Sequence, residues 1–389
     1  RSSDLTTITT NGGDVVMAGG LDNGANGGVA GDGRPDNYAT STIDYGVYVT
    51  TSSILDAGGG NIIAYGSGPS RGILTAGGAQ ISTSGTGNIT FIGNAYGSGA
   101  VSYGVNINRS TLSAGSGNIT LTGISTGASP SNYGVIIENS GTGTLVETTG
   151  NGNINITGTQ SGTGSDFYLN GSAMATVRSG GAGTITVNAN TINIGSVNAT
   201  IQTNGSIAFK PRTASTTYGI SGGTCGGTCD ISLTDTVLAR LFPDNDGNGV
   251  GSLIIGDAAA GTGTVDINGW DFSNKTYDVE VYGGTVDLTG SPIVWNGGND
   301  LTLYSRTGDF VIDQDFTRNA GMAGNGTLTI KAAGSISSSG IRTIAAATSG
   351  ATGKLHTILW ADANNDQSGY ISLSSTSITS NGGDRSEEH

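Results

Sequence analysis

The sequence predicts an all-β fold, a right-handed parallel β-helix (β-solenoid) with loop excursions. Three observations support it: a very high glycine content, short phrases that recur about every 30 residues, and apolar residues that alternate within each phrase. Of the 389 residues, 70 are glycine and only 6 are proline. A glycine costs about 0.5 to 1 kcal/mol inside a regular element, so this frequency indicates tight turns throughout the chain. The 35% of hydrophobic residues argues against disorder, because disordered chains lack them.

One phrase recurs four times in the first half of the chain, at spacings of 30, 35 and 31 residues. Its copies are GNITFIG at 87, GNITLTG at 117, GNINITG at 152 and GTITVNA at 183. A second phrase, YGVYV, YGVNI or YGVII, begins at Tyr45, Tyr103 and Tyr133. Together with the short runs between the phrases, each unit of about 30 residues is expected to hold three short strands.

Within the first phrase, apolar residues occupy every second position, as in a strand with one buried face. The inward positions are Ile89, Phe91, Ile119, Leu121, Ile154, Ile156, Ile185 and Val187. No helix-length apolar pattern connects the strands, so we expect the chain to coil rather than to return through crossover helices. Equivalent strands would then stack about 4.8 Å apart, with an amide ladder of Asn88, Asn118 and Asn153 outside. Glycine at each phrase boundary is expected to supply corners of positive φ.

We expect three regions along the chain. Residues 1–220 form a β-helix with long coils of about 30 residues. Residues 221–251 fit neither phrase and are expected to leave the helix, with both cysteines and one helical turn at Val237 to Phe242. Residues 252–389 form a β-helix with shorter coils, because GTVDI at 263 and GTVDL at 284 start only 21 residues apart.

A longer repeat is also present. The segment TITTNGGD at 7–14 returns as SITSNGGD at 377–384, an offset of 370 residues. From this match we expect the chain to span about one module of a tandem array, with cut faces at both ends. The neighbouring repeat modules of the same chain would be its first partners, because each unit of such an array contacts only its neighbours.

Composition limits the function. The formal net charge of −14 should repel nucleic acid and anionic membranes and attract divalent cations, so we expect no nucleic-acid partner. No apolar run approaches the roughly 18 residues of a membrane span, so we expect no direct membrane insertion. The only cysteines, Cys225 and Cys229, form either a local disulfide or a pair of free thiols. A disulfide would imply export to an oxidising compartment.

These features resemble a known family of bacterial exoproteins. The degenerate GNIT and GTLTI phrases, the run HTILWADANNDQSGYISLSSTSITSNGGD at 356–384 and the few, closely spaced cysteines are similar to the filamentous haemagglutinin type of adhesin. The resemblance implies export by two-partner secretion or a related outer-membrane route, a right-handed β-helical shaft, and roles in adhesion, aggregation or contact-dependent competition. It leaves any activity at the tip of such a fibre open.

Three acidic loops are candidate calcium sites, because calcium prefers converging oxygen ligands. The first consists of Asp244, Asp246 and Asn248, which match the first half of a calcium-binding loop, although Ile255 stands where a bidentate Glu is needed. The other two consist of Asp362, Asn364, Asp366 and Ser368, and of Asp22, Asp32 and Asp36. Each of the first two loops is alternatively an acidic surface turn without a metal, and the third is expected to be a mobile excursion instead.

Two pairs of carboxylates bear on catalysis. Asp266 and Asp287 occupy the same position in phrases 21 residues apart, so stacked coils would bring like charges together. Asp313 and Asp315 share one face of a predicted strand, as carboxylates do in polysaccharide-cleaving enzymes. Glycoside hydrolysis also needs a proton donor of raised pKa, and both groups are expected to be solvated. We therefore expect no enzymatic activity.

The leading hypothesis is a structural or adhesive shaft module of a large, repetitive, secreted bacterial surface protein. Its partners would be glycans or proteins on host or neighbouring cells. The alternative is a carbohydrate-active β-helix, either a polysaccharide lyase or hydrolase or a phage-type tail fibre. The only histidines, His356 and His389, complete no convincing nucleophilic constellation. The tryptophans and tyrosines would stack on sugars only if exposed in a row, and packing at coil corners is the alternative.

Overall fold

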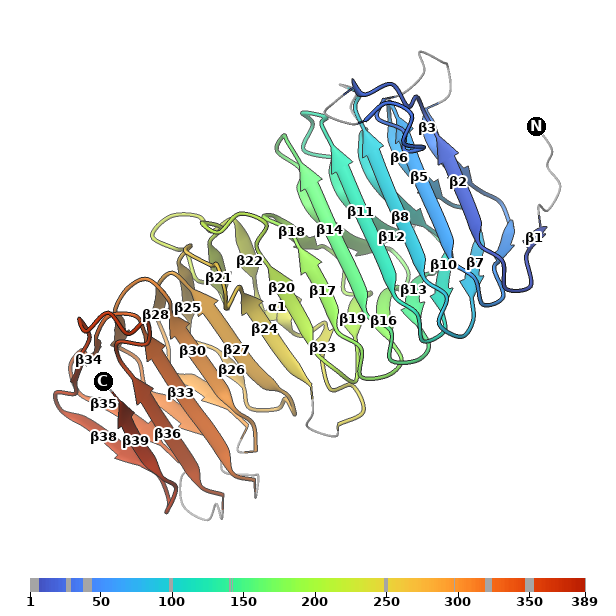
Figure 1. Cartoon of the computed structure of the whole chain (residues 1–389). Helices are drawn as coiled ribbons and strands as arrows, with labels where there is room; N and C mark the ends of the chain where they lie inside the picture. The colour runs from blue at the N-terminus through green and yellow to red at the C-terminus, as the bar shows by residue number, and fades with distance from the viewer. Residues whose placement is uncertain are drawn as a thin grey trace. The chain divides into compact units, whose positions relative to one another are not determined.

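The computed structural model describes residues 7–25, 29–37, 44–97, 101–139, 141, 143–247, 251–296, 298–318, 324–346 and 353–388. Within these residues the protein is almost entirely β-structure, arranged in long parallel sheets (Figure 1). The predicted parallel β-helix is confirmed. The chain divides into two compact units: unit 1 comprises Arg1–Ile207 and Arg240–Phe242, and unit 2 comprises Ala208–Ala239 and Pro243–His389.

Unit 1 contains three parallel sheets, and each coil contributes one strand to each of them. Sheet A contains β1 (Thr7–Thr9), β4 (Ile54–Asp56), β7 (Gln80–Thr83), β10 (Thr111–Ala114), β13 (Thr144–Thr148), β16 (Ala175–Ser179), β19 (Ala199–Gln202) and β23 (Leu241–Phe242). Sheet B contains β2 (Val15–Gly19), β5 (Ile62–Gly68), β8 (Ile89–Ala95), β11 (Ile119–Ser125), β14 (Ile154–Gln160) and β17 (Ile185–Asn188). Sheet C contains β3 (Tyr45–Val49), β6 (Arg71–Thr75), β9 (Tyr103–Asn108), β12 (Tyr133–Asn139), β15 (Ser165–Gly171) and β18 (Ile192–Ile194).

Unit 2 also has three strands in each coil. Sheet D contains β24 (Ser252–Gly256), β27 (Asp278–Gly283), β30 (Leu301–Ser305), β33 (Gly326–Ala332), β36 (Leu355–Trp360) and β39 (Arg385–Glu388). Sheet E contains β21 (Tyr218–Ile220), β22 (Ile231–Leu233), β25 (Val265–Asn268) and β28 (Val286–Thr289). Sheet F contains β26 (Asp271–Phe272), β29 (Ile293–Trp295), β32 (Phe316–Arg318), β35 (Arg342–Ala345) and β38 (Thr376–Thr379), and sheet G contains β31 (Phe310–Ile312), β34 (Ile336–Ser338) and β37 (Ile371–Ser372). Strand β20 (Ile207–Lys210) lies at the boundary of the two units.

The interior of unit 1 consists of apolar columns that run across sheet B. Ile89, Ile119, Ile154 and Ile185 pair in successive strands, and all four are fully buried. The pairing matches the predicted stack of phrases residue by residue. Since each inward side chain packs on its equivalents in the coils before and after, the repeat period fixes the core.

The expected ladder of asparagines is present, in a more specific form. The side-chain oxygen of Asn88 accepts the backbone N–H of Asn118 at 2.8 Å, and that of Asn118 accepts the N–H of Asn153 at 2.8 Å. In sheet D, Asp278 accepts the N–H of Asp300 at 2.8 Å in the same way. Each side chain therefore satisfies the first free amide of the next strand, which explains why an Asn or Asp precedes so many strands.

Glycine at the start of a phrase serves close packing, so the expectation of positive φ at these boundaries is wrong. A Cβ atom at Gly117 or Gly152 would lie 1.9 or 2.0 Å from the carbonyl oxygen of the equivalent glycine in the preceding coil. Positive φ occurs instead in turns, for example at Gly58, Gly77 and Gly85. The phrase glycines are therefore needed because coils approach too closely there for any side chain.

A second set of glycines lets sheets B and C meet. A Cβ atom at Gly93 would lie 2.1 Å from the carbonyl oxygen of Gly104, and one at Gly123 would lie 2.0 Å from that of Gly134. These are the last glycine of the first phrase and the glycine of the YGV phrase. Each of the two recurring phrases therefore supplies one of the two glycines at which sheets B and C make backbone contact.

Segment 221–251 was expected to leave the helix, and this expectation is wrong for part of it. Strand β22 pairs with β21 in sheet E, and β23 pairs with β19 in sheet A. The helical turn is α1 (Asp235–Leu238), capped by Thr234, and it ends before the expected Phe242. Among the described residues, no helix is long and apolar enough to cross a membrane.

Both copies of the eight-residue repeat adopt the same type of turn. Asn11 and Asn381 have positive φ values of 35° and 47°. In each copy the N–H group two residues further on donates to a carbonyl oxygen at 3.0 Å, from Gly13 to Thr10 and from Gly383 to Ser380. The two segments therefore match in structure as well as in sequence.

Candidate functional site

Cys225 and Cys229 form a disulfide whose loop is anchored by Asp266 in unit 2. The Asp266 side chain is only 4% exposed. One carboxylate oxygen accepts the backbone N–H groups of Thr224 and Cys225 at 2.8 and 2.9 Å, and the other accepts the hydroxyl of Thr289 at 2.6 Å. Charge-assisted hydrogen bonds of this kind stabilise a buried carboxylate, so Asp266 holds the disulfide loop on sheet E.

Asp287 pairs with Asp266 in adjacent strands, which is the like-charge contact that the phrase spacing predicted. Burial raises the pKa of Asp287, and the negative charge of Asp266 raises it further. Burial also raises the pKa of Asp313, with smaller contributions from Asp287 and Asp266, while Arg342 opposes them. One oxygen of Asp313 is buried without a hydrogen-bond partner. The carboxyl groups of Asp287 and Asp313 therefore retain their protons more strongly than an ordinary aspartate does.

Asp313 and Asp315 do not form a matched catalytic pair. The carboxylate of Asp315 accepts the backbone N–H of Thr343 at 2.8 Å, and its backbone oxygen accepts the N–H of Ile293 at 2.9 Å. Asp315 is thus engaged in holding coils together. Asp313 is the group whose raised pKa suits proton donation.

The two described aspartates of the first calcium candidate differ in burial. Asp244 is buried and its carbonyl oxygen accepts the N–H of Gly247 at 2.9 Å, while Asp246 is exposed. Asn248, the third predicted ligand, lies outside the described residues. Within the described part of the chain, no group of three or more His, Cys, Asp or Glu side chains is placed to hold a metal ion.

The two other acidic loops are closed by backbone amides. Asp22 accepts the N–H groups of Gly31 and Gly33 at 2.5 and 2.7 Å. Asp362 accepts those of Asp366 and Gln367 at 2.8 and 3.0 Å. The oxygens that would ligate a cation therefore stabilise the turn itself.

A column of aromatic side chains, missed at the level of the sequence, crosses sheet C in unit 1. We call it the tyrosine–arginine stack, and it consists of Tyr45, Arg71, Tyr103, Tyr133 and Tyr168. The guanidinium carbon of Arg71 lies 5.4 Å from the ring centre of Tyr45 and 5.0 Å from that of Tyr103. The rings of Tyr133 and Tyr168 are 4.5 Å apart and nearly parallel, at 19°. The ring faces in this stack therefore pack against one another or against the Arg71 guanidinium.

The stack encloses polar groups. Glu138 accepts the side-chain N–H groups of Asn106 and Asn108 at 2.7 and 3.3 Å. Burial raises the pKa of Tyr103, and the charge of Glu138 raises it further. Asn106 has no exposed area, whereas Glu138 and Asn108 are half-buried, so the network lies partly beneath the stack surface.

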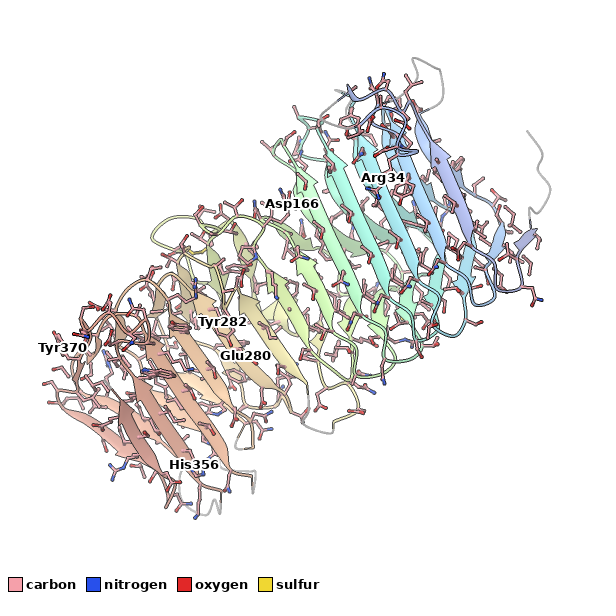
Figure 2. All side chains as sticks on the ribbon, in the orientation of Figure 1. Arg34, Asp166, Glu280, Tyr282, His356 and Tyr370 are labelled. Carbon is pink, nitrogen blue, oxygen red and sulfur yellow. A yellow bond between two sulfur atoms is a disulfide. The ribbon has the colours of Figure 1, made fainter. Side chains whose placement is uncertain are left out.

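A second column, which we call the aromatic row, crosses the outer face of sheet D in unit 2. Its members pair in successive strands and are Tyr282, Tyr304, Lys331 and Trp360. The residues before them alternate inward and are buried, which places the row on the solvent side. Figure 2 labels Tyr282 beside Glu280, to which its hydroxyl donates a hydrogen bond.

The row differs from the stack in its ring geometry and in the exposure of Trp360. The rings of Tyr282 and Tyr304 are 6.5 Å apart and meet edge to face at 75°. The Lys331 ammonium lies 4.6 Å from the ring centre of Trp360, and Trp360 is 37% exposed. By contrast Trp270 and Trp295 are buried, as expected for aromatic residues at coil corners. Both columns could have been located from the sequence by aligning successive coils. The alignment would compare the first residues of the YGV phrases for the stack and the residues near the ends of the sheet D strands for the row.

No protein-family model matches this sequence, and comparisons with curated proteins and with solved structures find no match either.

Proposed function

We propose that this chain is a structural and adhesive shaft module of a secreted bacterial surface protein of the filamentous haemagglutinin type. The observation that supports the proposal is the pairing of equivalent strands from coil to coil along sheets B and D, which builds outer faces where side chains recur at every coil. A surface that repeats with the coil suits weak contacts that act together on another cell.

Export is part of the proposal. The Cys225–Cys229 disulfide supports a location in an oxidising compartment, because such bonds persist in secreted and surface proteins. The charge of −14 suits a partner that is neither nucleic acid nor anionic membrane. Neighbouring repeat modules, together with glycans or proteins of another cell surface, are the proposed partners.

Adhesion can be measured with beads that carry the purified chain. We expect more of these beads than of beads carrying an unrelated acidic protein to remain on epithelial cells or on bacterial cells after washing. Retention at the level of the control beads on both cell types would contradict the adhesive function.

A carbohydrate-active β-helix is the second candidate, and the raised pKa of Asp313 favours it. A general acid must still carry its proton near the working pH, and this carboxyl retains it more strongly than usual. The test is incubation with acidic polysaccharides and assay of new reducing ends. Cleavage that is lost in Asp313→Asn and kept in Asp315→Asn would establish the enzyme, and no cleavage by the wild type would remove it.

A further inference from the structure

We propose that the aromatic row on sheet D binds an uncharged glycan chain that lies across the strands. This inference rests on the adhesive function proposed above and names the site and the ligand class. The row contains two tyrosines, a lysine and a partly exposed tryptophan in four adjacent strands, β27, β30, β33 and β36.

The dimensions of the row suit an extended ligand. Adjacent strands are about 4.8 Å apart, so the three steps from Tyr282 to Trp360 span about 14 Å. Because the strands are in register, the four members of the row lie side by side in four consecutive strands. A straight row of this length matches an oligosaccharide better than a compact small molecule, which would need a concave pocket.

The chemistry of the row combines apolar rings with hydrogen-bonding groups. Tyrosine and tryptophan present an apolar ring with one polar atom, and a sugar ring presents apolar C–H groups between hydroxyls. A parallel column on the same face contains Glu280, Thr302 and Thr329, which pair in successive strands. These side chains offer a carboxylate and two hydroxyls at the spacing of the rings.

Two contacts hold the row in position before any ligand arrives. The hydroxyl of Tyr282 donates to Glu280, and the ammonium of Lys331 lies over the Trp360 ring. Side chains that are already ordered lose less conformational entropy on binding.

Charge selects the class of glycan. Asp278, Glu280 and Asp300 lie on the strands that carry the row or directly before them, and the whole chain has a net charge of −14. Lys331 is the one cation of the row itself. A polyanionic glycan would be repelled by this surface, so the expected ligand is uncharged.

The test uses the full chain with three probes: a cello-oligosaccharide, an N-acetylglucosamine oligosaccharide and an acidic oligogalacturonate. Isothermal titration calorimetry and tryptophan fluorescence should detect at least one uncharged probe and no acidic one. Trp360→Ala and Tyr304→Ala should each weaken that binding about tenfold or more, equivalent to about 1.4 kcal/mol. Trp360→Phe should restore most of it, because an aromatic ring remains.

The matched control is Tyr370→Ala, which removes an aromatic ring that is 61% exposed and lies outside the row. Its affinity should equal that of the wild type, and circular dichroism should show that all variants are folded. The proposal is overturned if no uncharged probe binds, if only oligogalacturonate binds, or if Trp360→Ala and Tyr304→Ala bind as well as Tyr370→Ala.

The bead assay separates this site from the adhesive function. If beads carrying Trp360→Ala or Tyr304→Ala adhere as well as the wild type, adhesion stands and this site is not its cause. If wild-type beads do not adhere but the calorimetric result holds, the glycan site stands and the adhesive function fails.

Discussion

The two aromatic columns arise from the same principle and differ in what their rings can reach. Parallel strands in register place the members of the row side by side, and likewise Tyr45, Arg71, Tyr103 and Tyr133 of the stack. Tyr168 pairs with Ile136 instead and joins the stack only through its ring contact with Tyr133. In the tyrosine–arginine stack the Tyr133 ring lies 5.4 Å from that of Tyr103 and 4.5 Å from that of Tyr168, so its faces are covered. In the aromatic row, Trp360 keeps over a third of its surface exposed. Register therefore creates a column, and the exposure of Trp360 is what distinguishes the aromatic row from the tyrosine–arginine stack.

The largest effect is expected from disturbing the glycine contact between sheets B and C of unit 1. Gly104→Ala places a Cβ atom 2.3 Å from the backbone nitrogen of Ile124 and should destabilise unit 1 by about 3 kcal/mol or more. All three tryptophans lie in unit 2, so fluorescence should change little while circular dichroism reports the loss.

Gly59→Ala is the control for this substitution, because nothing lies within 4 Å of its Cβ position and its φ is not positive. It should leave both signals unchanged. Equal stability of the Gly104→Ala and Gly59→Ala proteins would contradict the close approach of sheets B and C.

Replacing one tyrosine in each column measures how much each column contributes to stability. Tyr133→Ala removes two ring contacts, and at about 0.5 to 1.5 kcal/mol for each aromatic pair the loss should be about 2 kcal/mol. Tyr304→Ala removes one edge-to-face contact and should cost about 1 kcal/mol. Chemical denaturation measures both, and a larger loss for Tyr304→Ala would reverse the assignment of roles.

Acidity should also distinguish the units, because Asp287 and Asp313 of unit 2 have raised pKa values. A carboxyl with a raised pKa binds its proton more tightly in the folded state than at the unfolded value of 3.8. Its contribution to stability is full below that value and is lost as pH rises through the folded pKa. Tryptophan fluorescence should therefore show that part of the stability of unit 2 is lost as pH rises above 3.8 and through the raised pKa values of these two carboxyls.

The double variant Asp287→Asn and Asp313→Asn should flatten this pH dependence, since neither side chain can then ionise. Asp366→Asn is a useful contrast, because hydrogen bonds from Ser368 and Asn364 lower the pKa of Asp366. An unchanged pH profile in the double variant would mean that these two carboxyls do not set it.

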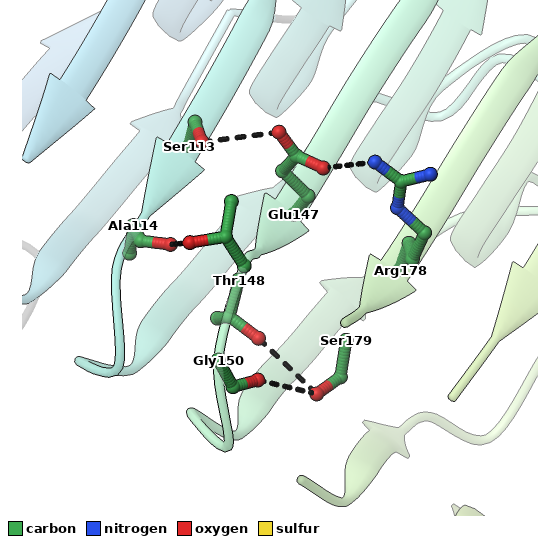
Figure 3. Close-up of polar contacts among 8 residues, drawn as sticks. Ser113, Ala114, Glu147, Thr148, Gly150, Arg178 and Ser179 are labelled. Atoms are coloured by element: carbon green, nitrogen blue, oxygen red, sulfur yellow. Dashed lines mark hydrogen bonds and ion pairs between the residues drawn. The ribbon is translucent and has the colours of Figure 1, made fainter. Parts of the chain in front are cut away.

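The smallest effect is expected at the surface of sheet A. Figure 3 shows Glu147 between Ser113, whose hydroxyl donates to it at 3.1 Å, and Arg178, with which it forms an ion pair. The Arg178 side chain is largely exposed, so Arg178→Ala should lower the free energy of unfolding by less than about 1 kcal/mol. The loss should shrink further in high salt, because salt screens exposed charges.

Much of the fold followed from the spacing of phrases. The stacking of Ile89, Ile119, Ile154 and Ile185 could be predicted because strand alternation allows only one register that buries all of them. The role of the phrase glycines could not, since a sequence does not reveal how closely two backbones approach. Positive φ was the natural explanation for Gly117, and a carbonyl oxygen in the preceding coil is the real one.

The candidate site was less accessible from the sequence. Asp266 and Asp287 were placed together correctly, yet the hydrogen bonds from the disulfide loop that hold Asp266 depend on a turn with no repeat to guide it. The aromatic row was harder still, because Tyr282, Tyr304 and Trp360 stand in phrases of different wording and in coils of different length. Only the register of the strands brings them into one line.

Both columns depend on which residues lie side by side in successive coils. An engineered disulfide between two adjacent strands can test this register. Thr120 and Asn155 pair in β11 and β14 on the outer face of sheet B. In the double variant Thr120→Cys and Asn155→Cys, stacked coils place the Cα atoms within the roughly 4.4 to 6.8 Å that a disulfide requires, so oxidation should join them. The pair Thr120→Cys and Ile156→Cys, shifted by one residue to the opposite face, should stay reduced. Joining of the shifted pair, or of neither pair, as measured by mass spectrometry of the digested protein, would contradict the stacking on which both columns depend.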